Sequence, residues 1–215
     1  MGSEVPKQYL SLGGRAVIDH TVERLLFHPA LDGLYLALDE QDRNWDETAF
    51  AGHPDLVRVK GGHERAHSVL NALEALSDRA SLDDWVLVHD AARPCVRRDD
   101  IDRLIEVAES HPVGAVLGSR LHDTIKRTDT RGCIETTVDR NGLWRAFTPQ
   151  MFRLGKLKDT LAGALEAGVL VTDEASALEW SGERPQMVQG YLDNIKITQP
   201  ADLELASFFL ERQAH

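Results

Sequence analysis

Short apolar segments alternate with amphipathic segments along most of the chain, and this alternation limits the fold more than any other feature of the sequence. Buried strands are predicted at 33–38, 56–59, 85–89 and 114–118, and helices at 16–27, at 64–76 and in a segment capped by Asp99 or Asp100. Strands and helices in this order build a sheet that helices cover on both faces. We therefore expect an α/β fold.

The pattern changes after residue 120. Residues 123–128 and 134–138 are polar and β-branched, and the Asp129-Thr130-Arg131-Gly132 turn between them predicts a β-hairpin. The hairpin has few large apolar side chains, so it either packs on a partner or lies on the surface of a monomer. Further helices are expected at 154–167, from an N-cap at Thr172 to Gly182, and from about Pro200, with strands at 187–189 and 194–198.

Composition and charge exclude several classes of function. The chain has 215 residues, 42% of them apolar, and no apolar run approaches the roughly 20 residues of a membrane helix. With 24 basic and 35 acidic residues the net charge is −11, which argues against binding to nucleic acid or to an anionic membrane. Cys95 and Cys133 form no CxxC pair, so we expect a reducing, cytoplasmic location, and the nine histidines lack zinc-ligand spacing.

Two segments in the first part of the chain could contact phosphate. Lys7 lies in Pro6-Lys7-Gln8-Tyr9-Leu10, although a lone lysine near a terminus is usually a solvated surface group. Residues 61–68, with the sequence Gly-Gly-His-Glu-Arg-Ala-His-Ser, run from a strand into a helix. Glycines at a helix start let backbone N–H groups approach a ligand, but an ordinary strand-to-helix turn has the same appearance.

The segment Val88-His89-Asp90-Ala91-Ala92-Arg93-Pro94 follows the clearest predicted strand. An aspartate at the carboxyl end of a parallel strand, with two small residues after it, typically binds a ribose hydroxyl or a metal–phosphate unit. A helix cap is the alternative, but a cap does not require Ala-Ala-Arg-Pro behind it. We favour the functional interpretation.

Two later clusters are polar enough to contact substrate, and each is weak alone. In the first, residues 123–127, 137–144 and 148–150, the Arg140-Asn-Gly turn should present a guanidinium outward, although charged hairpins are usually only solvated. In the second, residues 172–176 and 194–196, Thr172 is also explained as a helix cap and Lys196 as a surface lysine.

The chain resembles the 2-C-methyl-D-erythritol 4-phosphate cytidylyltransferase family in eight stretches that follow the family's order: PKQYL, GGxER, VHDAARP, DTIKR, TVDRNGLW, TPQ, TDEASALE and DNIKIT. The resemblance implies one Rossmann-like nucleotidyltransferase domain over residues 1–215, a three-layer sandwich with a projecting β-arm at 121–143 that forms a homodimer. It implies transfer of CMP from CTP to 2-C-methyl-D-erythritol 4-phosphate, with Mg²⁺ and release of pyrophosphate, in isoprenoid precursor biosynthesis.

The resemblance also assigns roles to single residues. Lys7 and Lys196 would be catalytic. CTP would be bound by Gly62, His63, Ser68, Asp90 and Ala91, with Asp90 also at the metal. The sugar phosphate would be bound by Thr124, Arg140, Thr148, Thr172 and Lys196, and Arg140 would reach the neighbouring subunit's site. Because both substrates are anions that must be held in line, such a site needs cations rather than a covalent nucleophile.

The sequence departs from the family pattern in two places. Family members have an apolar strand and a glycine-rich loop resembling AAGxGxR ahead of the PKQ stretch, and without that strand its sheet neighbours would have unpaired ladder groups. We therefore expect weak CTP binding and slow or no turnover from the sequence as it stands, and a misassigned start codon or an incomplete sequence as the reason that the strand and loop are missing. His63 stands where an acidic residue is expected beside cytosine, and a neutral imidazole can still hydrogen-bond there.

Two alternatives stay open at this point. A cytidylyltransferase for another polyol phosphate, such as ribitol 5-phosphate, would share the fold and the CTP site. A non-catalytic dimeric relic would explain the absent loop, but Lys7, Asp90, Arg140 and Lys196 are all still present, which argues against long decay.

Overall fold

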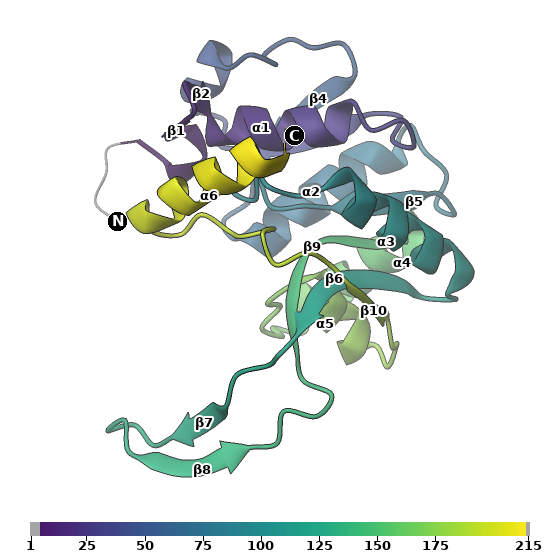
Figure 1. The fold of residues 1–215 in the computed structure, drawn as a ribbon. Helices are drawn as coiled ribbons and strands as arrows, with labels where there is room; N and C mark the ends of the chain where they lie inside the picture. The colour runs from purple at the N-terminus through teal and green to yellow at the C-terminus, as the bar shows by residue number, and fades with distance from the viewer. Residues whose placement is uncertain (1–4, 214–215) are drawn as a thin grey trace.

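The computed structural model describes residues 5–213, which form a body of sheets and helices with a long hairpin arm (Figure 1). The strands are β1 (Ser11–Leu12), β2 (Arg15–Ala16), β3 (Leu34–Leu38), β4 (Leu56–Lys60), β5 (Trp85–Val88), β6 (Gly114–Arg120), β7 (Ile125–Thr128), β8 (Ile134–Val138), β9 (Trp144–Arg153) and β10 (Gln186–Gln189). The helices are α1 (Val17–Leu26), α2 (Arg65–Ser77), α3 (Arg98–Ser110), α4 (Leu154–Glu166), α5 (Glu174–Trp180) and α6 (Pro200–Gln213), with 3-10 turns η1 (Lys7–Tyr9) and η2 (Asn44–Glu47). No helix within residues 5–213 is both long and apolar enough to cross a bilayer.

The larger sheet has the strand order β10-β6-β9-β5. Strands β10 and β6 are parallel, and β9 runs antiparallel to both β6 and β5. Strand β9 was not predicted from the sequence, where residues 148–150 appear only as part of a polar cluster. Six consecutive residues of β9, 147–152, are buried, so the strand has no period-two alternation to reveal it.

The two faces of this sheet are covered by different helices, which confirms the expected layers. Val116 of β6 packs in one cluster with Phe152 and with side chains of α2, α4 and α5. Its neighbours Ala115 and Leu117 pack in another cluster with Leu104 of α3. Successive side chains of a strand point to opposite faces, so β6 is the middle layer between two helical layers.

Strands β3 and β4 form a separate parallel pair, and a cavity separates them from the larger sheet. Among residues 5–213, β3 pairs with β4 alone and β5 pairs with β9 alone, so each has one edge without a strand beside it. The cavity has a volume of about 1040 Å³ and is lined by residues 34–38 of β3 and 85–88 of β5. We call this cavity the slot.

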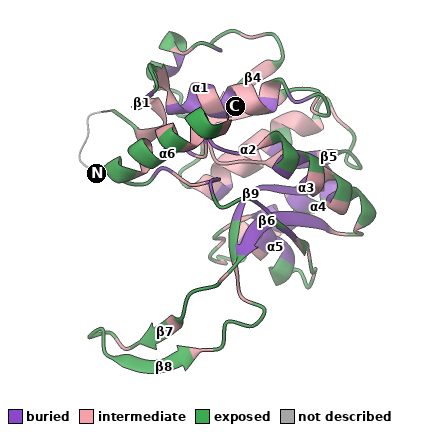
Figure 2. Ribbon diagram, viewed as in Figure 1, coloured by how far each residue is buried: buried purple, intermediate pink, exposed green. Residues whose placement is uncertain are grey.

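The arm consists of β7, β8 and the connections that join them to β6 and β9 (Figure 1). Its base is closed where the Leu121 N–H donates to the Leu143 carbonyl at 3.1 Å. Beyond the base the arm is exposed along almost its whole length (Figure 2), and Ile134 at its outer strand is 66% exposed. The arm therefore adds nothing to the core, as its polar composition predicts.

Two predicted helix caps were wrong by one to three residues. Helix α3 begins at Arg98 after an Arg97 N-cap, so Asp99 and Asp100 lie in its first turn. Helix α5 is capped by Asp173 rather than by Thr172. The Asp173 carboxylate accepts a hydrogen bond from the Ser176 N–H at 2.9 Å, which is the usual contact of an N-cap aspartate.

The strand predicted at 194–198 does not form. The backbone of this segment binds a loop instead of a neighbouring strand, because the Ile197 N–H donates to the Ala92 carbonyl at 2.8 Å. Ile197 is also fully buried, so the apolar character that suggested a strand serves to anchor the segment beside β5.

The two cysteines should react very differently with a thiol reagent. Cys95 is fully buried, and burial raises the pKa of its thiol to about 12, whereas Cys133 is exposed on the arm. Because the thiolate is the reactive form, iodoacetamide at pH 8 should modify Cys133 at least about tenfold faster than Cys95. Peptide mass spectrometry over time measures both rates, and equal rates would contradict the burial of Cys95.

Candidate active site

Three charged side chains from distant parts of the sequence meet at the slot. Asp90 follows the carboxyl end of β5, and its Oδ2 lies 2.9 Å from the Nζ of Lys196. Lys7 of η1 lines the slot together with both residues. Burial and the Lys196 ammonium lower the pKa of Lys7, and the Asp90 carboxylate acts against them. The structure thus brings together three residues that the sequence analysis had singled out separately.

Asp90 is held by three cations. Its Oδ1 accepts a hydrogen bond from the Arg65 Nε at 2.8 Å. Its Oδ2 accepts one from the Arg93 Nε at 3.4 Å and also contacts Lys196. Burial alone would raise the pKa of Asp90, but Arg65 and Lys196 lower it well below its usual value. The carboxylate is therefore ionised and serves to orient the surrounding cations.

A set of buried hydrogen bonds fixes the segment that carries Lys196. The Asp90 N–H donates to the Thr148 hydroxyl oxygen at 3.0 Å, and the Asn194 side-chain amide donates to the Thr148 carbonyl at 2.8 Å. Arg93 donates to the Asn194 carbonyl, also at 2.8 Å. Thr148 and Asn194 are both almost fully buried, and the Thr148 hydroxyl is engaged by the backbone of Asp90.

Gly62 and Ser68 are brought together at the start of α2. The Gly62 N–H donates to the Ser68 hydroxyl at 2.9 Å. A Cβ at position 62 would lie 2.3 Å from the His67 Cβ, so only glycine fits there. Ser68 and Ala91 both line the slot, whereas His63, the residue after Gly62, is exposed. The turn is therefore a compact structure in its own right as well as a candidate ligand contact.

Three residues, one in β9 and one each at the starts of α2 and α5, were not recognised from the sequence or were only partly recognised. Gln150, which is 1% exposed, accepts the Ala175 N–H and donates to Asp173, both at 2.9 Å. Glu174 is equally buried and pairs with Arg65. The stretches TPQ, GGxER and TDEASALE contain these residues, but nothing in one sequence indicates that they contact one another.

Thr124 and Arg140 lie apart from the residues around Asp90. Both are exposed, both belong to the base of the arm, and neither lines the slot. The Arg140 guanidinium donates to the His122 carbonyl, and the turn after it is closed by a bond of 3.0 Å from the Leu143 N–H to the Arg140 carbonyl. The predicted turn is present, with the Arg140 guanidinium bound to the backbone of the arm. Thr172, also exposed, lies next to the capped start of α5.

The described residues do not fit a resident divalent metal. A protein-held Mg²⁺ or Ca²⁺ takes several oxygen ligands, and residues 5–213 contain no group of three or more His, Cys, Asp or Glu side chains that could supply them. The carboxylate oxygens of Asp90 face Arg65, Arg93 and Lys196.

Comparison with known proteins decides the family. The sequence profile of the family described as "IspD: 2-C-methyl-D-erythritol 4-phosphate cytidylyltransferase" matches residues 1–212. The chain belongs to this family. A protein of the same description from Vibrio vulnificus (strain CMCP6) is 54% identical over 213 residues, which are 99% of this chain and 90% of that protein. One from Shewanella amazonensis is 52% identical over 213 residues, which are 99% of this chain and 89% of that protein.

Solved structures of cytidylyltransferase family members share the fold. One titled "Crystal structure of 4-diphosphocytidyl-2C-methyl-D-erythritol synthase" is 38% identical, with a TM-score of 0.86 over 95% of each chain. A family member from Francisella tularensis is 37% identical, with a TM-score of 0.86 over 96% of this chain and 94% of that one. The Rossmann-like nucleotidyltransferase sandwich that the resemblance implied is thereby confirmed.

Proposed function

We propose that the protein transfers CMP from CTP to 2-C-methyl-D-erythritol 4-phosphate and releases pyrophosphate. Membership in the cytidylyltransferase family supports the reaction. The observation that carries the proposal is the meeting of Lys7, Asp90 and Lys196 at one place, because this gives an acidic protein a local group of cations. Two anionic substrates can approach each other only where such charge is available.

In the proposed reaction, a phosphate oxygen of the sugar phosphate attacks the α-phosphorus of CTP. The bond from that phosphorus to the oxygen bridging to the β-phosphorus breaks, and pyrophosphate leaves with the bonding electrons. The Lys7 and Lys196 ammonium groups stabilise the charge that develops on the α-phosphoryl oxygens. Asp90 keeps Lys196 in place through the 2.9 Å contact. No covalent intermediate with the protein is needed.

We further propose that CTP lies against Gly62, His63, Ser68, Asp90 and Ala91. Asp90 would contact the ribose or the metal side of the nucleotide. Mg²⁺ would enter as part of the magnesium complex of CTP, since residues 5–213 supply no set of ligands for a resident ion and Mg²⁺ usually keeps phosphates and waters as ligands. Bound to CTP, the ion would neutralise triphosphate charge, and Lys7 and Lys196 would orient the reacting groups.

The sugar phosphate is proposed to contact Thr148, Thr172 and Lys196 of one subunit and Thr124 and Arg140 of another. A homodimer is proposed because these two sets lie on different parts of a single chain, one near the slot and one on the exposed arm at 121–143. A cytoplasmic location is proposed because Cys95 and Cys133 are free thiols, as a reducing compartment maintains them.

Pyrophosphate release tests the proposed function. The chain is assayed with CTP, Mg²⁺ and 2-C-methyl-D-erythritol 4-phosphate, then with ribitol 5-phosphate in place of that acceptor. A second form carries an added apolar strand and glycine-rich loop of the family type ahead of Met1, because the slot has room beside β3 and β5. Release with methylerythritol phosphate by either form supports the proposal. Faster release with ribitol 5-phosphate, or none from two folded forms, overturns it.

Replacing Arg140 should affect one substrate more than the other. In Arg140→Ala the proposed second-subunit contact to the sugar phosphate is lost, so its KM should rise at least about tenfold while the KM for CTP changes less than about twofold. Steady-state kinetics with each substrate varied in turn measures both values. Arg131→Ala is the matched control, because Arg131 is 83% exposed at the tip of the same arm. Equal losses for both substrates would contradict the assigned role.

A further inference from the structure

Arg65 contacts two carboxylates at once, and none of the roles proposed above uses it. Its Nε donates to Asp90 Oδ1 at 2.8 Å. Its Nη1 and Nη2 donate to the two carboxylate oxygens of Glu174 at 2.5 and 3.1 Å. Glu174 is only 1% exposed. Because a guanidinium is rigid and planar, a buried carboxylate that accepts both Nη groups fixes the direction of its Nε as well.

Glu174 is itself held in place by the larger sheet. It is the first residue of α5, and the N–H of the next residue, Ala175, donates to the Gln150 side chain of β9 at 2.9 Å. Gln150 also donates to the Asp173 cap of the same helix. A continuous set of contacts therefore runs from β9 through Glu174 and Arg65 to Asp90.

This set of contacts ends at a proposed catalytic group. With Oδ1 of Asp90 held by Arg65, the other oxygen, Oδ2, lies 2.9 Å from the Lys196 Nζ. Arg65 also begins α2, close in sequence to Gly62 and Ser68, while Glu174 follows Thr172. The pair thus joins the segment proposed for CTP to the segment proposed for the sugar phosphate.

We propose that Arg65 and Glu174 are positioning residues: Glu174 orients Arg65, and Arg65 holds one oxygen of Asp90 so that the other faces Lys196. This inference rests on the proposed function, in which Lys196 stabilises charge on the α-phosphoryl group. Neither residue needs to touch a substrate. Their effect on the reaction is transmitted through the orientation of Asp90.

A purely structural pair and a positioning pair respond differently to removal of both charges. Replacing a buried ion pair by apolar residues of similar volume is often neutral for stability, whereas removing one partner leaves an uncompensated buried charge. The double variant Arg65→Met/Glu174→Met therefore separates the two roles. It removes the charge of both groups and leaves Asp90 Oδ1 without the hydrogen bond that Arg65 donates.

The test measures turnover and stability in the same variants. In the double variant the urea midpoint should stay near that of the wild type, while kcat falls roughly 10²-fold and the KM for CTP changes less than about threefold. Arg65→Lys should lose kcat to a similar degree, because one ammonium cannot bridge two carboxylates in this geometry. A wild-type kcat in either variant would overturn the proposal.

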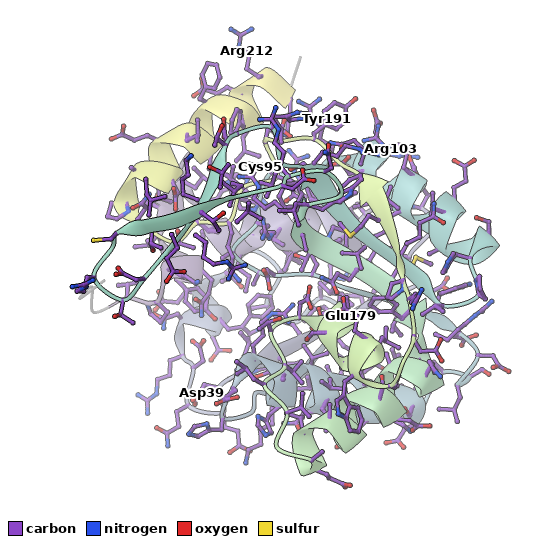
Figure 3. All side chains as sticks on the ribbon, turned by 90° about the horizontal axis from the view of Figure 1, so that it is seen from below. Asp39, Cys95, Arg103, Glu179, Tyr191 and Arg212 are labelled. Atoms are coloured by element: carbon purple, nitrogen blue, oxygen red, sulfur yellow. The ribbon has the colours of Figure 1, made fainter. Side chains whose placement is uncertain are left out.

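The matched control breaks a different buried pair. Arg103 of α3 pairs with Asp100, which is fully buried, and Figure 3 shows Arg103 close to Tyr191, over whose ring it stacks at 4.9 Å. Arg103 does not line the slot. Arg103→Met should lower the urea midpoint and leave kcat unchanged.

A wild-type protein that transfers no CMP would overturn the proposed function. A crystal structure of the Arg65→Met/Glu174→Met variant tests the positioning role independently of that result. The contact of 2.9 Å between Lys196 and Asp90 should be lost or lengthened in the variant. Its retention with unchanged side-chain positions would overturn the positioning role.

Discussion

Lys196→Ala should lower kcat by roughly 10²- to 10³-fold, the size of effect seen when one group that stabilises transition-state charge is removed. The lysine contacts Asp90 at 2.9 Å and comes from a segment that buried hydrogen bonds fix beside β5. Its proposed role is to stabilise charge that is greatest during transfer, so the KM for CTP should change much less than kcat. Pyrophosphate release under saturating substrates measures the change.

Lys156→Ala is the control for this substitution. Lys156 lies in α4 and pairs with Glu183, and its side chain is 45% exposed. Its loss should leave kcat within about twofold of the wild type, because an exposed ion pair contributes little to the stability of the fold. If Lys196→Ala retained more than a third of the wild-type kcat, the charge that acts on the α-phosphoryl group would have to come from elsewhere.

Phe152→Ala should lower the free energy of unfolding by about 3–5 kcal/mol, the range for a large aromatic side chain removed from a packed core. Phe152 lies in β9 between β5 and β6, is fully buried, and contacts the cluster that joins the sheet to α2, α4 and α5. Helices α2, α4 and α5 pack on one another as well as on the sheet, so they cannot move in to fill the resulting cavity. Urea unfolding followed by circular dichroism measures the loss.

Phe208→Ala on α6 provides the comparison, because this side chain is 49% exposed. Its removal should cost less than about 1 kcal/mol, since about half of its surface is already in water. Similar losses in the two variants would mean that β9 is not the packed centre of the sheet.

Elements with a clear hydrophobic period could be predicted from the sequence, and those without one could not. Helices α1, α2 and α4 and strands β3 and β5 were predicted within one or two residues, since each presents one apolar face or one short apolar run. Strand β9 was missed because its centre is buried on both faces. The segment predicted as a strand at 194–198 is apolar because it anchors Lys196, and local sequence does not distinguish the two cases.

The same limit applies to the site. Lys7, Asp90 and Lys196 were picked out in three separate polar segments, the family resemblance assigned their roles, and the fold places them together. The Arg65–Glu174 contact could not be predicted, because the two residues are 109 positions apart and each is an ordinary charged residue at the start of a helix. Their significance depends on burial and on the geometry of one guanidinium, which exist only in the folded chain.

The slot between β3 and β5 also bears on folding cooperativity. Hydrogen-bonded ladders join β5, β6, β9 and β10 into one network and β3 and β4 into another, and α2 packs against both β3 and α4 across the division. Regions that share few hydrogen bonds open as separate cooperative units. Helix α1 belongs with the larger unit, because the Thr21 hydroxyl donates to the Ala91 carbonyl at 2.9 Å and Val17 packs with Ile197. The β3–β4 pair is then the part expected to open while Asp90 and Lys196 stay in place. Such a partial opening removes one wall of the slot, so activity should be lost before the larger sheet unfolds.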